Sequence, residues 1–275
     1  MLQVSGAGTT IFAGNGTLDV GNFNQGGNGL ISVLGNNTAT INSVIYGNSP
    51  LRKQGAGKLI LTGDNQYGGQ TQVNEGVLNI QRSTALGSHS GDTLVRATGS
   101  LEFQQSTFGP LVIGLENITV EGFGGSGNVG ALRNIAGNNS LAGTITFNSN
   151  TGASSDVLTK FAGNMVNNSN GNTNSMTSPF AYFDVALGTT LTFTGSEGGN
   201  ADPVKLGGGT VEYAGYLGNL DRGHRVYEGT MLLNRVPGLS SSGSMGTLYI
   251  GSDAPGAPTS PTVLLGGPDQ PVSYT

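Results

Sequence analysis

The chain has 275 residues, of which only 10% are charged, and its formal net charge is −5. The 49 glycines, together with many Asn, Ser and Thr residues, disfavour long helices and favour short strands joined by tight turns. The acidic balance argues against nucleic acid as a partner. The lack of cysteine excludes disulfides and thiolate metal sites. No apolar run is long enough for a membrane-spanning helix.

The N-terminal residues lack the basic segment and apolar core of a signal peptide. We therefore expect an internal piece of a longer exported chain, or a mature form. Collagen is excluded because no Gly-X-Y period runs through the sequence. Disorder is disfavoured because apolar residues recur in short clusters and the net charge is low.

One unit recurs along the chain: a glycine-rich turn, a short alternating strand and a closing glycine. Its four copies are residues 6–14, 55–63, 187–195 and 207–215. A second unit, a strand followed by a Glu-Gly turn and another strand, is shared by residues 73–80 and 226–233. The return of the same turns and strands at long spacing favours stacked coils over isolated hairpins.

These repeats predict an all-β fold, a right-handed parallel β-helix, or β-solenoid, with short strands and Gly/Asn-rich corners. A coil of roughly 20–25 residues would give about eleven to thirteen coils. Glycine and asparagine suit the corners because they adopt positive φ at low cost. The predicted inward positions are Leu59, Leu61, Val73, Val77, Leu78, Ile80, Leu191, Phe193, Val211 and Leu232.

Residues 55–80, from Gly-Ala-Gly-Lys-Leu-Ile-Leu-Thr-Gly through to Val-Asn-Glu-Gly-Val-Leu-Asn-Ile, resemble the autotransporter-associated β-strand repeat. Residues 130–139 and 228–234 are similar to further pieces of it, and the clear matches extend over 55–87, 130–148 and 207–235. The resemblance implies a bacterial surface or secreted protein with a β-helical passenger. The motif is specific for fold and says little about function.

We expect a single solenoid segment over 1–275, with no linker clean enough to divide it. Two stretches are predicted to protrude as loops. Residues 163–178 are Asn- and Ser-rich and too polar to pack, and residues 251–261 contain three prolines that interrupt strand pairing.

The densest charged cluster surrounds His224, between Asp221 and Arg225. It could serve acid/base chemistry or anion binding, and a corner loop between two strands is the favoured alternative. The carboxylates are otherwise spread singly, and the glycine-rich run 124–128 lacks the Asp of a calcium-binding repeat. We therefore predict no catalytic site, no cofactor and no metal, while noting that distant carboxylates can meet on stacked coils.

The leading functional prediction is a structural, rod-like protein of the bacterial cell surface or exterior. Uncapped terminal coils would let identical chains associate head to tail into a filament. The alternative is an adhesin that binds glycans or other cells through exposed Asn, Thr and Tyr side chains, including Tyr67, Tyr213, Tyr216 and Tyr227. A polysaccharide-degrading enzyme ranks third. The candidate ligand or assembly contacts are Tyr213, Tyr216, Arg222, His224 and Arg225.

Overall fold

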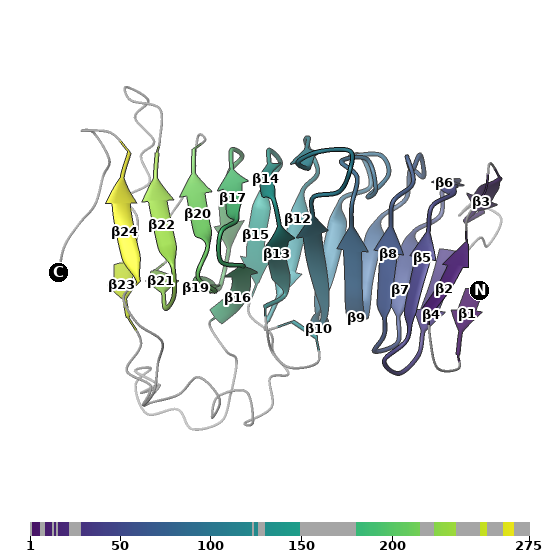
Figure 1. Ribbon diagram of the computed structural model, residues 1–275, viewed down its shortest axis with the longest axis horizontal. Coiled ribbons are helices and arrows are strands. Elements are labelled where there is room, and N and C mark those ends of the chain that lie inside the picture. The colour runs from purple at the N-terminus through teal and green to yellow at the C-terminus, as the bar shows by residue number, and fades with distance from the viewer. Residues whose placement is uncertain are drawn as a thin grey trace.

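The structure is a computed structural model, and it describes residues 2–5, 9–12, 14, 16–21, 29–122, 124–125, 130–148, 180–214, 223–234, 248–251 and 261–266. All regular structure in these ranges is β-strand, and the strands follow one another along a single long axis from β1 to β24 (Figure 1). The loop predicted at 163–178 and residues 252–260 of the loop predicted at 251–261 lie outside the described residues.

The longest wall of the rod is a parallel ladder that receives one strand from each successive coil. Its strands, in spatial order, are β1 (Leu2–Val4), β4 (Gly29–Val33), β7 (Leu51–Gln54), β9 (Thr71–Ile80), β10 (Thr93–Gln104), β13 (Leu132–Ala136), β16 (Phe180–Val185), β19 (Asp202–Leu206), β21 (His224–Val226) and β23 (Leu248–Ile250).

Further strands join the same sheet beside this ladder, and they are β2 (Thr9–Phe12), β5 (Thr38–Ile41), β8 (Lys58–Leu61), β12 (Ile118–Glu121), β15 (Ile145–Asn148) and β18 (Glu197–Gly199). A separate six-stranded parallel sheet comprises β11 (Val112–Ile113), β14 (Asn138–Leu141), β17 (Thr190–Phe193), β20 (Thr210–Tyr213), β22 (Thr230–Leu233) and β24 (Thr262–Leu265). A short third sheet pairs β3 (Thr17–Asp19) with β6 (Val44–Tyr46).

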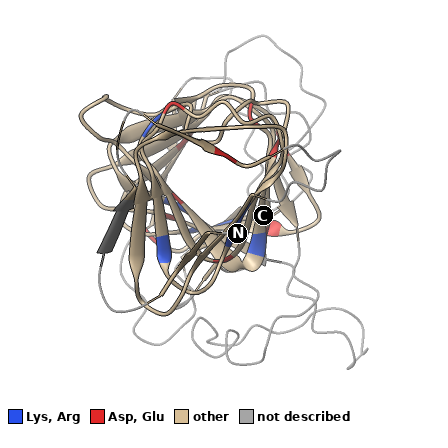
Figure 2. Cartoon of the chain, turned by 90° about the vertical axis from the view of Figure 1, so that its right-hand side faces the viewer, with Lys and Arg blue, Asp and Glu red and all other residues tan. Residues whose placement is uncertain are grey.

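Seen end on, the strands surround a common axis, and few charged residues mark the walls (Figure 2). Parallel pairing of sequential coils around one axis confirms the predicted parallel β-solenoid. The single isolated bridge with antiparallel geometry in the described residues joins Ser106 and Gly109.

The coil length is visible in side-chain hydrogen bonds between equivalent positions of neighbouring coils. Thr62 donates to Asn42, and Thr84 donates to Asp64, and each pair is 20 residues apart in sequence. Other coils are longer: Ser100 bonds to a carbonyl 30 residues ahead. The longest ladder therefore has ten strands in the described residues, fewer than the predicted eleven to thirteen coils, because insertions lengthen several coils.

The core follows the two-residue alternation of β-strands. Eight of the ten predicted inward side chains are buried, the exceptions being Val77 and Leu232, which are half-buried. In β22 the buried residues are Met231 and Leu233, which pair with buried Val211 and Tyr213 of β20. The prediction for Leu232 was wrong by one residue, and in a strand a shift of one moves a side chain to the opposite face.

Large aromatic side chains fill the axis in the second half of the rod. Phe183 packs against Phe147 at 5.9 Å and against Phe193 at 6.0 Å between ring centroids. Phe193 then meets Tyr213 edge to face at 5.3 Å. Such tilted and edge-to-face pairs stabilise the interior beyond simple burial.

Candidate functional site

The predicted contact residues are only partly brought together. Tyr216 and Arg222 lie outside the described residues. The ring of Tyr213 packs edge to face on the ring of His224, 5.6 Å away, and both side chains are about 1% exposed. Arg225 is half-buried, and its guanidinium stacks on the ring of Tyr249 at 3.9 Å. Of the described members of this set, only Arg225 presents part of its side chain outward.

His224 belongs to the core, in β21, instead of a surface loop. Its Nε2 lies 3.0 Å from Oε2 of Glu197 in the interior. The expectation of exposed tyrosines is also wrong for Tyr67 and Tyr213, which are 0% and 1% exposed. The cause is register: Tyr213 pairs with inward-facing Phe193, and the hydroxyl of Tyr67 is bonded inside to Thr71 at 2.5 Å.

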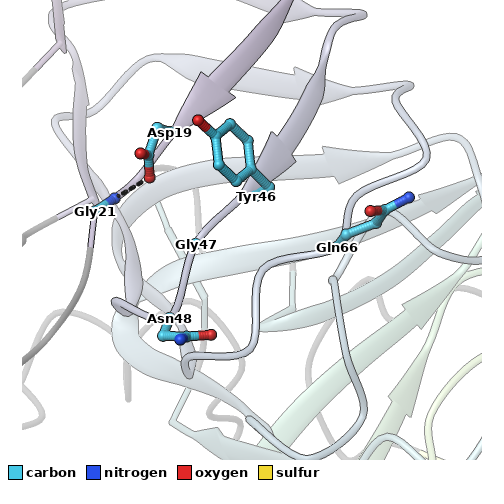
Figure 3. Close-up of a pocket in the computed structure, with 6 residues that line it drawn as sticks. All are labelled: Asp19, Gly21, Tyr46, Gly47, Asn48 and Gln66. Carbon is cyan, nitrogen blue, oxygen red and sulfur yellow. Dashed lines mark hydrogen bonds between the residues drawn. The ribbon is translucent and has the colours of Figure 1, made fainter.

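A hollow on the outside of the rod lies near its N-terminal end, where β3 and β6 pair (Figure 3). It has a volume of about 440 Å³ and is lined by Asp19, Gly21, Tyr46, Gly47, Asn48 and Gln66. The hollow is shallow and open to solvent, and polar and apolar groups line it about equally.

Three successive coils supply the side chains of this hollow. Asp19 pairs with Tyr46 in the parallel β3–β6 ladder, and the backbone N–H of Gln66 donates to the carbonyl of Ile45 at 2.7 Å. The amide of Gly21 donates to Oδ1 of Asp19 at 2.6 Å, which fixes the carboxylate beside the tyrosine (Figure 3). The ladder therefore lines up an acid, an aromatic ring and a carboxamide in one exposed row.

Glycine keeps the floor of this hollow open. A Cβ on Gly47 would lie 2.8 Å from the carbonyl of Gly21 and 2.9 Å from Oδ1 of Asp19, and its φ of +116° also disfavours any other residue. Sequence reasoning missed this site because its residues are 20 or more positions apart. The available signal was the coil period, which predicts that Tyr46 and Gln66 are neighbours.

A second polar group lies inside the rod around Glu116. Burial raises the pKa of this carboxyl to about 7, against the effect of the Thr93 hydroxyl, which donates to Oε1 at 2.7 Å. A carboxyl with such a pKa is suited to proton transfer near neutral pH. Glu116 is only 4% exposed, however, so substrate has little access to it.

An ionic ladder crosses the coils at Glu102. This buried carboxylate accepts hydrogen bonds from Lys58 at 2.9 Å, from Asn79 at 3.0 Å and from Arg133. Arg133 also approaches Asp184. Burial raises the pKa of Asp184 above its usual value, against the opposing effect of the Arg133 charge. Both carboxylates are paired with side chains of the rod itself, so these ion pairs have a structural role.

Two buried lysines form matching corner contacts, far apart in the chain. Nζ of Lys53 donates to the carbonyls of Gln54, Gly55 and Glu75 at 3.0, 2.6 and 2.9 Å. Nζ of Lys205 donates to the carbonyls of Leu206, Gly207 and Glu228 at 2.9, 2.6 and 3.0 Å. We call these two arrangements the lysine corners.

Each lysine corner is closed by a glutamate. Oε2 of Glu75 accepts from the amide of Gly55 at 3.2 Å, and Oε2 of Glu228 accepts from the amide of Gly207 at 2.9 Å. Burial lowers the pKa of both lysines to about 8, although the nearby glutamates act in the opposite direction. The lysines bind the protein's own backbone, which gives them a structural role.

The described ranges contain no group of three or more His, Cys, Asp or Glu side chains placed to hold a metal ion. Across the same ranges, no helix has the length and apolarity that crossing a membrane requires.

The corner around Lys53 coincides with a known repeat. The passenger-associated-transport-repeat family matches residues 51–80, which include Lys53, Gly55 and Glu75. The predicted resemblance to an autotransporter-associated repeat is confirmed at this segment, and the chain is a bacterial cell-surface or extracellular protein.

One curated relative is the adhesin BmaC autotransporter of Brucella suis biovar 1 (strain 1330). It is 29% identical to this chain over 234 residues, which cover 78% of the chain. The aligned region spans only 6% of that relative's own length. No solved structure matches the chain significantly.

The lysine corner at Lys205 extends the repeat beyond the matched segment. It lies outside residues 51–80, yet the same donor, the same three kinds of carbonyl and the same closing glutamate recur there. Residues 205–229 therefore form a second structural copy of the matched corner. This agrees with the predicted similarity of residues 73–80 and 226–233.

Proposed function

We propose that this segment is the rigid stalk of a bacterial surface adhesin and performs no catalysis. The observation that carries the proposal is the uninterrupted parallel ladder along one axis, in which each coil is hydrogen-bonded to the next. Such a rod holds binding surfaces away from the cell without disulfides. The similarity to a protein named as an autotransporter adhesin supports this role.

The non-catalytic part of the proposal rests on where the acids lie. Glu102, Glu116 and Glu197 are buried and bonded to neighbouring side chains. A glycoside-cleaving site needs two carboxyl groups facing one substrate cleft. The exposed hollow of the described residues contains one carboxylate, that of Asp19.

The test is adhesion by bacteria that display the parent protein with or without residues 1–275. We expect deletion to reduce attachment to cultured epithelial cells, with surface labelling to verify that both forms are exported. In a third strain, an unrelated rod of equal length replaces the segment. Restored attachment would indicate that the segment acts as a spacer, and continued loss would indicate that it provides a binding surface. Unchanged attachment after deletion, at equal surface display, would contradict the adhesin role.

A second candidate role is end-to-end self-association into a fibre. Apolar side chains on the last described strands are half-exposed, among them Ile250 of β23 at 52% and Leu264 of β24 at 49%. A parallel ladder with such an edge would accept the first coil of a second copy. Static light scattering at rising concentration tests this: mass should increase, and Leu264→Lys should suppress the increase. A constant monomer mass would refute it.

A further inference from the structure

We propose that the hollow formed by Asp19, Tyr46, Asn48 and Gln66 is a binding subsite for an uncharged sugar. This proposal rests on the adhesin role and names a ligand class and a place for it.

Several polar side chains elsewhere on the rod pair with the equivalent residue of the next coil. Thr62 donates to Asn42 at 2.6 Å, Thr84 donates to Asp64 at 2.5 Å, and Arg52 donates to Gln72 at 3.0 Å. Such pairs occupy part of the hydrogen-bonding capacity of these side chains and stabilise the stack.

The row at the hollow has no such pair among the described residues. The Tyr46 hydroxyl and the Asn48 and Gln66 carboxamides make no hydrogen bond to any described residue, and Asp19 uses only Oδ1, toward Gly21. All four side chains are exposed to solvent. These four polar groups around one hollow are therefore unpaired toward the described residues and exposed where a ligand could reach them (Figure 3).

The chemistry of these groups matches a pyranose. One face of such a ring carries C–H groups that pack on an aromatic ring, and Tyr46 offers a ring that is 40% exposed. The ring hydroxyls both donate and accept, so they suit the Asp19 carboxylate as acceptor and the two carboxamides as donors and acceptors. At about 4.8 Å between neighbouring strands, Asp19 and Gln66 lie about 10 Å apart along the row.

Charge selects among sugars. Asp19 is the one charged residue of the six that line the hollow, and the whole chain carries a net charge of −5. A sialylated or sulfated sugar would meet repulsion at this position, whereas a neutral hexose or N-acetylhexosamine would not. A divalent cation is disfavoured as well, because oxygen-rich cation sites use several carboxylate or carbonyl ligands.

The test is titration of the full chain with the methyl glycosides of glucose, galactose, mannose and N-acetylglucosamine, followed by saturation-transfer NMR. We expect at least one to bind saturably, with a dissociation constant on the order of 1 mM. Tyr46→Ala and Asp19→Asn should each weaken binding at least tenfold, while Tyr46→Phe retains the ring and should lose less.

Tyr249→Ala is the matched control, because Tyr249 is 42% exposed at the other end of the rod and should leave binding unchanged. The three altered residues, Asp19, Tyr46 and Tyr249, are on the surface, and circular dichroism verifies that each variant folds. The proposal is overturned if no uncharged glycoside binds, if binding survives both Tyr46→Ala and Asp19→Asn, or if sialyllactose or a short peptide binds better than every neutral sugar.

The adhesion assay separates this subsite from the adhesin role. If deletion of the segment abolishes attachment but Tyr46→Ala does not, the stalk function stands and the sugar subsite is not the one that attaches the cell. If sugars bind in solution but deletion leaves attachment intact, the subsite stands and the adhesin role falls.

Discussion

The two lysine corners have the same contacts in different sequence settings. Position 54 is Gln and position 206 is Leu, while position 56 is Ala and position 208 is Gly. Yet the four hydrogen bonds of each corner differ in length by at most a few tenths of an ångström. The first corner lies among coils of 20 residues, and the second follows a much longer coil.

This difference shows which residues a corner requires. The lysine bonds to backbone carbonyls, which every residue has. The lysine contact itself therefore does not require a particular side chain at position 54 or 206. The corner does require the lysine, whose ammonium donates to the carbonyls, and the glutamate, whose carboxylate accepts from a backbone amide. It also requires glycines, because the tight turn needs positive φ. The corner is therefore a backbone motif with few side-chain requirements, and coil length elsewhere does not disturb it.

The largest expected effect comes from the glycine after each glutamate. A Cβ on Gly76 would lie 2.4 Å from the carbonyl oxygen of Gly55, and a Cβ on Gly229 would lie 2.4 Å from that of Gly209. Both glycines also have positive φ, 69° and 67°. We expect Gly76→Ala and Gly229→Ala each to lower the free energy of unfolding by about 4 kcal/mol, measured by urea denaturation.

Two other glycines provide the matched controls for that comparison. Gly35 and Gly188 have positive φ, but a Cβ added there meets nothing within 4 Å. Gly35→Ala and Gly188→Ala should therefore cost only about 1 kcal/mol of backbone strain. Equal losses at all four positions would show that φ alone, and not the close approach of neighbouring coils, sets the requirement for glycine.

The next effect comes from the lysines. Lys53→Met and Lys205→Met keep most of the apolar stem but leave three carbonyls of each corner without their ammonium donor. We expect each variant to lose about 3 kcal/mol of unfolding free energy. Because coils contact mainly their neighbours, amide hydrogen exchange should increase near the altered corner and remain unchanged at the other one. Loss of protection at both corners would contradict their independence.

The smallest effect is a pH dependence. Both lysines have a pKa of about 8 in the fold and 10.5 without it, so between these values the unfolded chain holds more protons than the folded one. Stability should therefore rise as pH increases from 7 to 9.5, by up to about 2 kcal/mol per lysine. Each Lys→Met variant should retain about half of the rise, and the double variant should show none. A fall in stability over this range in the wild-type protein would contradict the assignment.

The sequence predicted the architecture because glycine-rich turns and strand alternation are local properties. The inward positions of β17 and Val211 of β20 follow from alternation within a single strand, and the same alternation places Tyr213 inward, against its prediction as a contact residue. Leu232 was assigned wrongly because four apolar or β-forming residues in a row, Thr230 to Leu233, give no alternation to read. Its face is decided by the pairing of Met231 with Val211 on the neighbouring coil.

The sites were harder to predict because they depend on which coils are neighbours. Coil length varies, so the alignment of Asp19 with Tyr46 cannot be counted from a fixed period. His224 was the most conspicuous charged position in the sequence, yet in the fold it is a core residue paired with Glu197 across 27 positions. Composition identifies unusual residues, and only register shows whether they face inward.

The 20-residue spacing of the side-chain ladders has a consequence for how such proteins change over generations. A duplication or deletion of one 20-residue coil preserves the parallel backbone ladder and the inward alternation at the junction, because neighbouring coils of this length present backbone groups in the same register. Each such event would alter the reach of the rod by about 4.8 Å, the distance between adjacent strands. A lineage can thus tune how far its surface proteins extend from the cell by copying units, without inventing new packing.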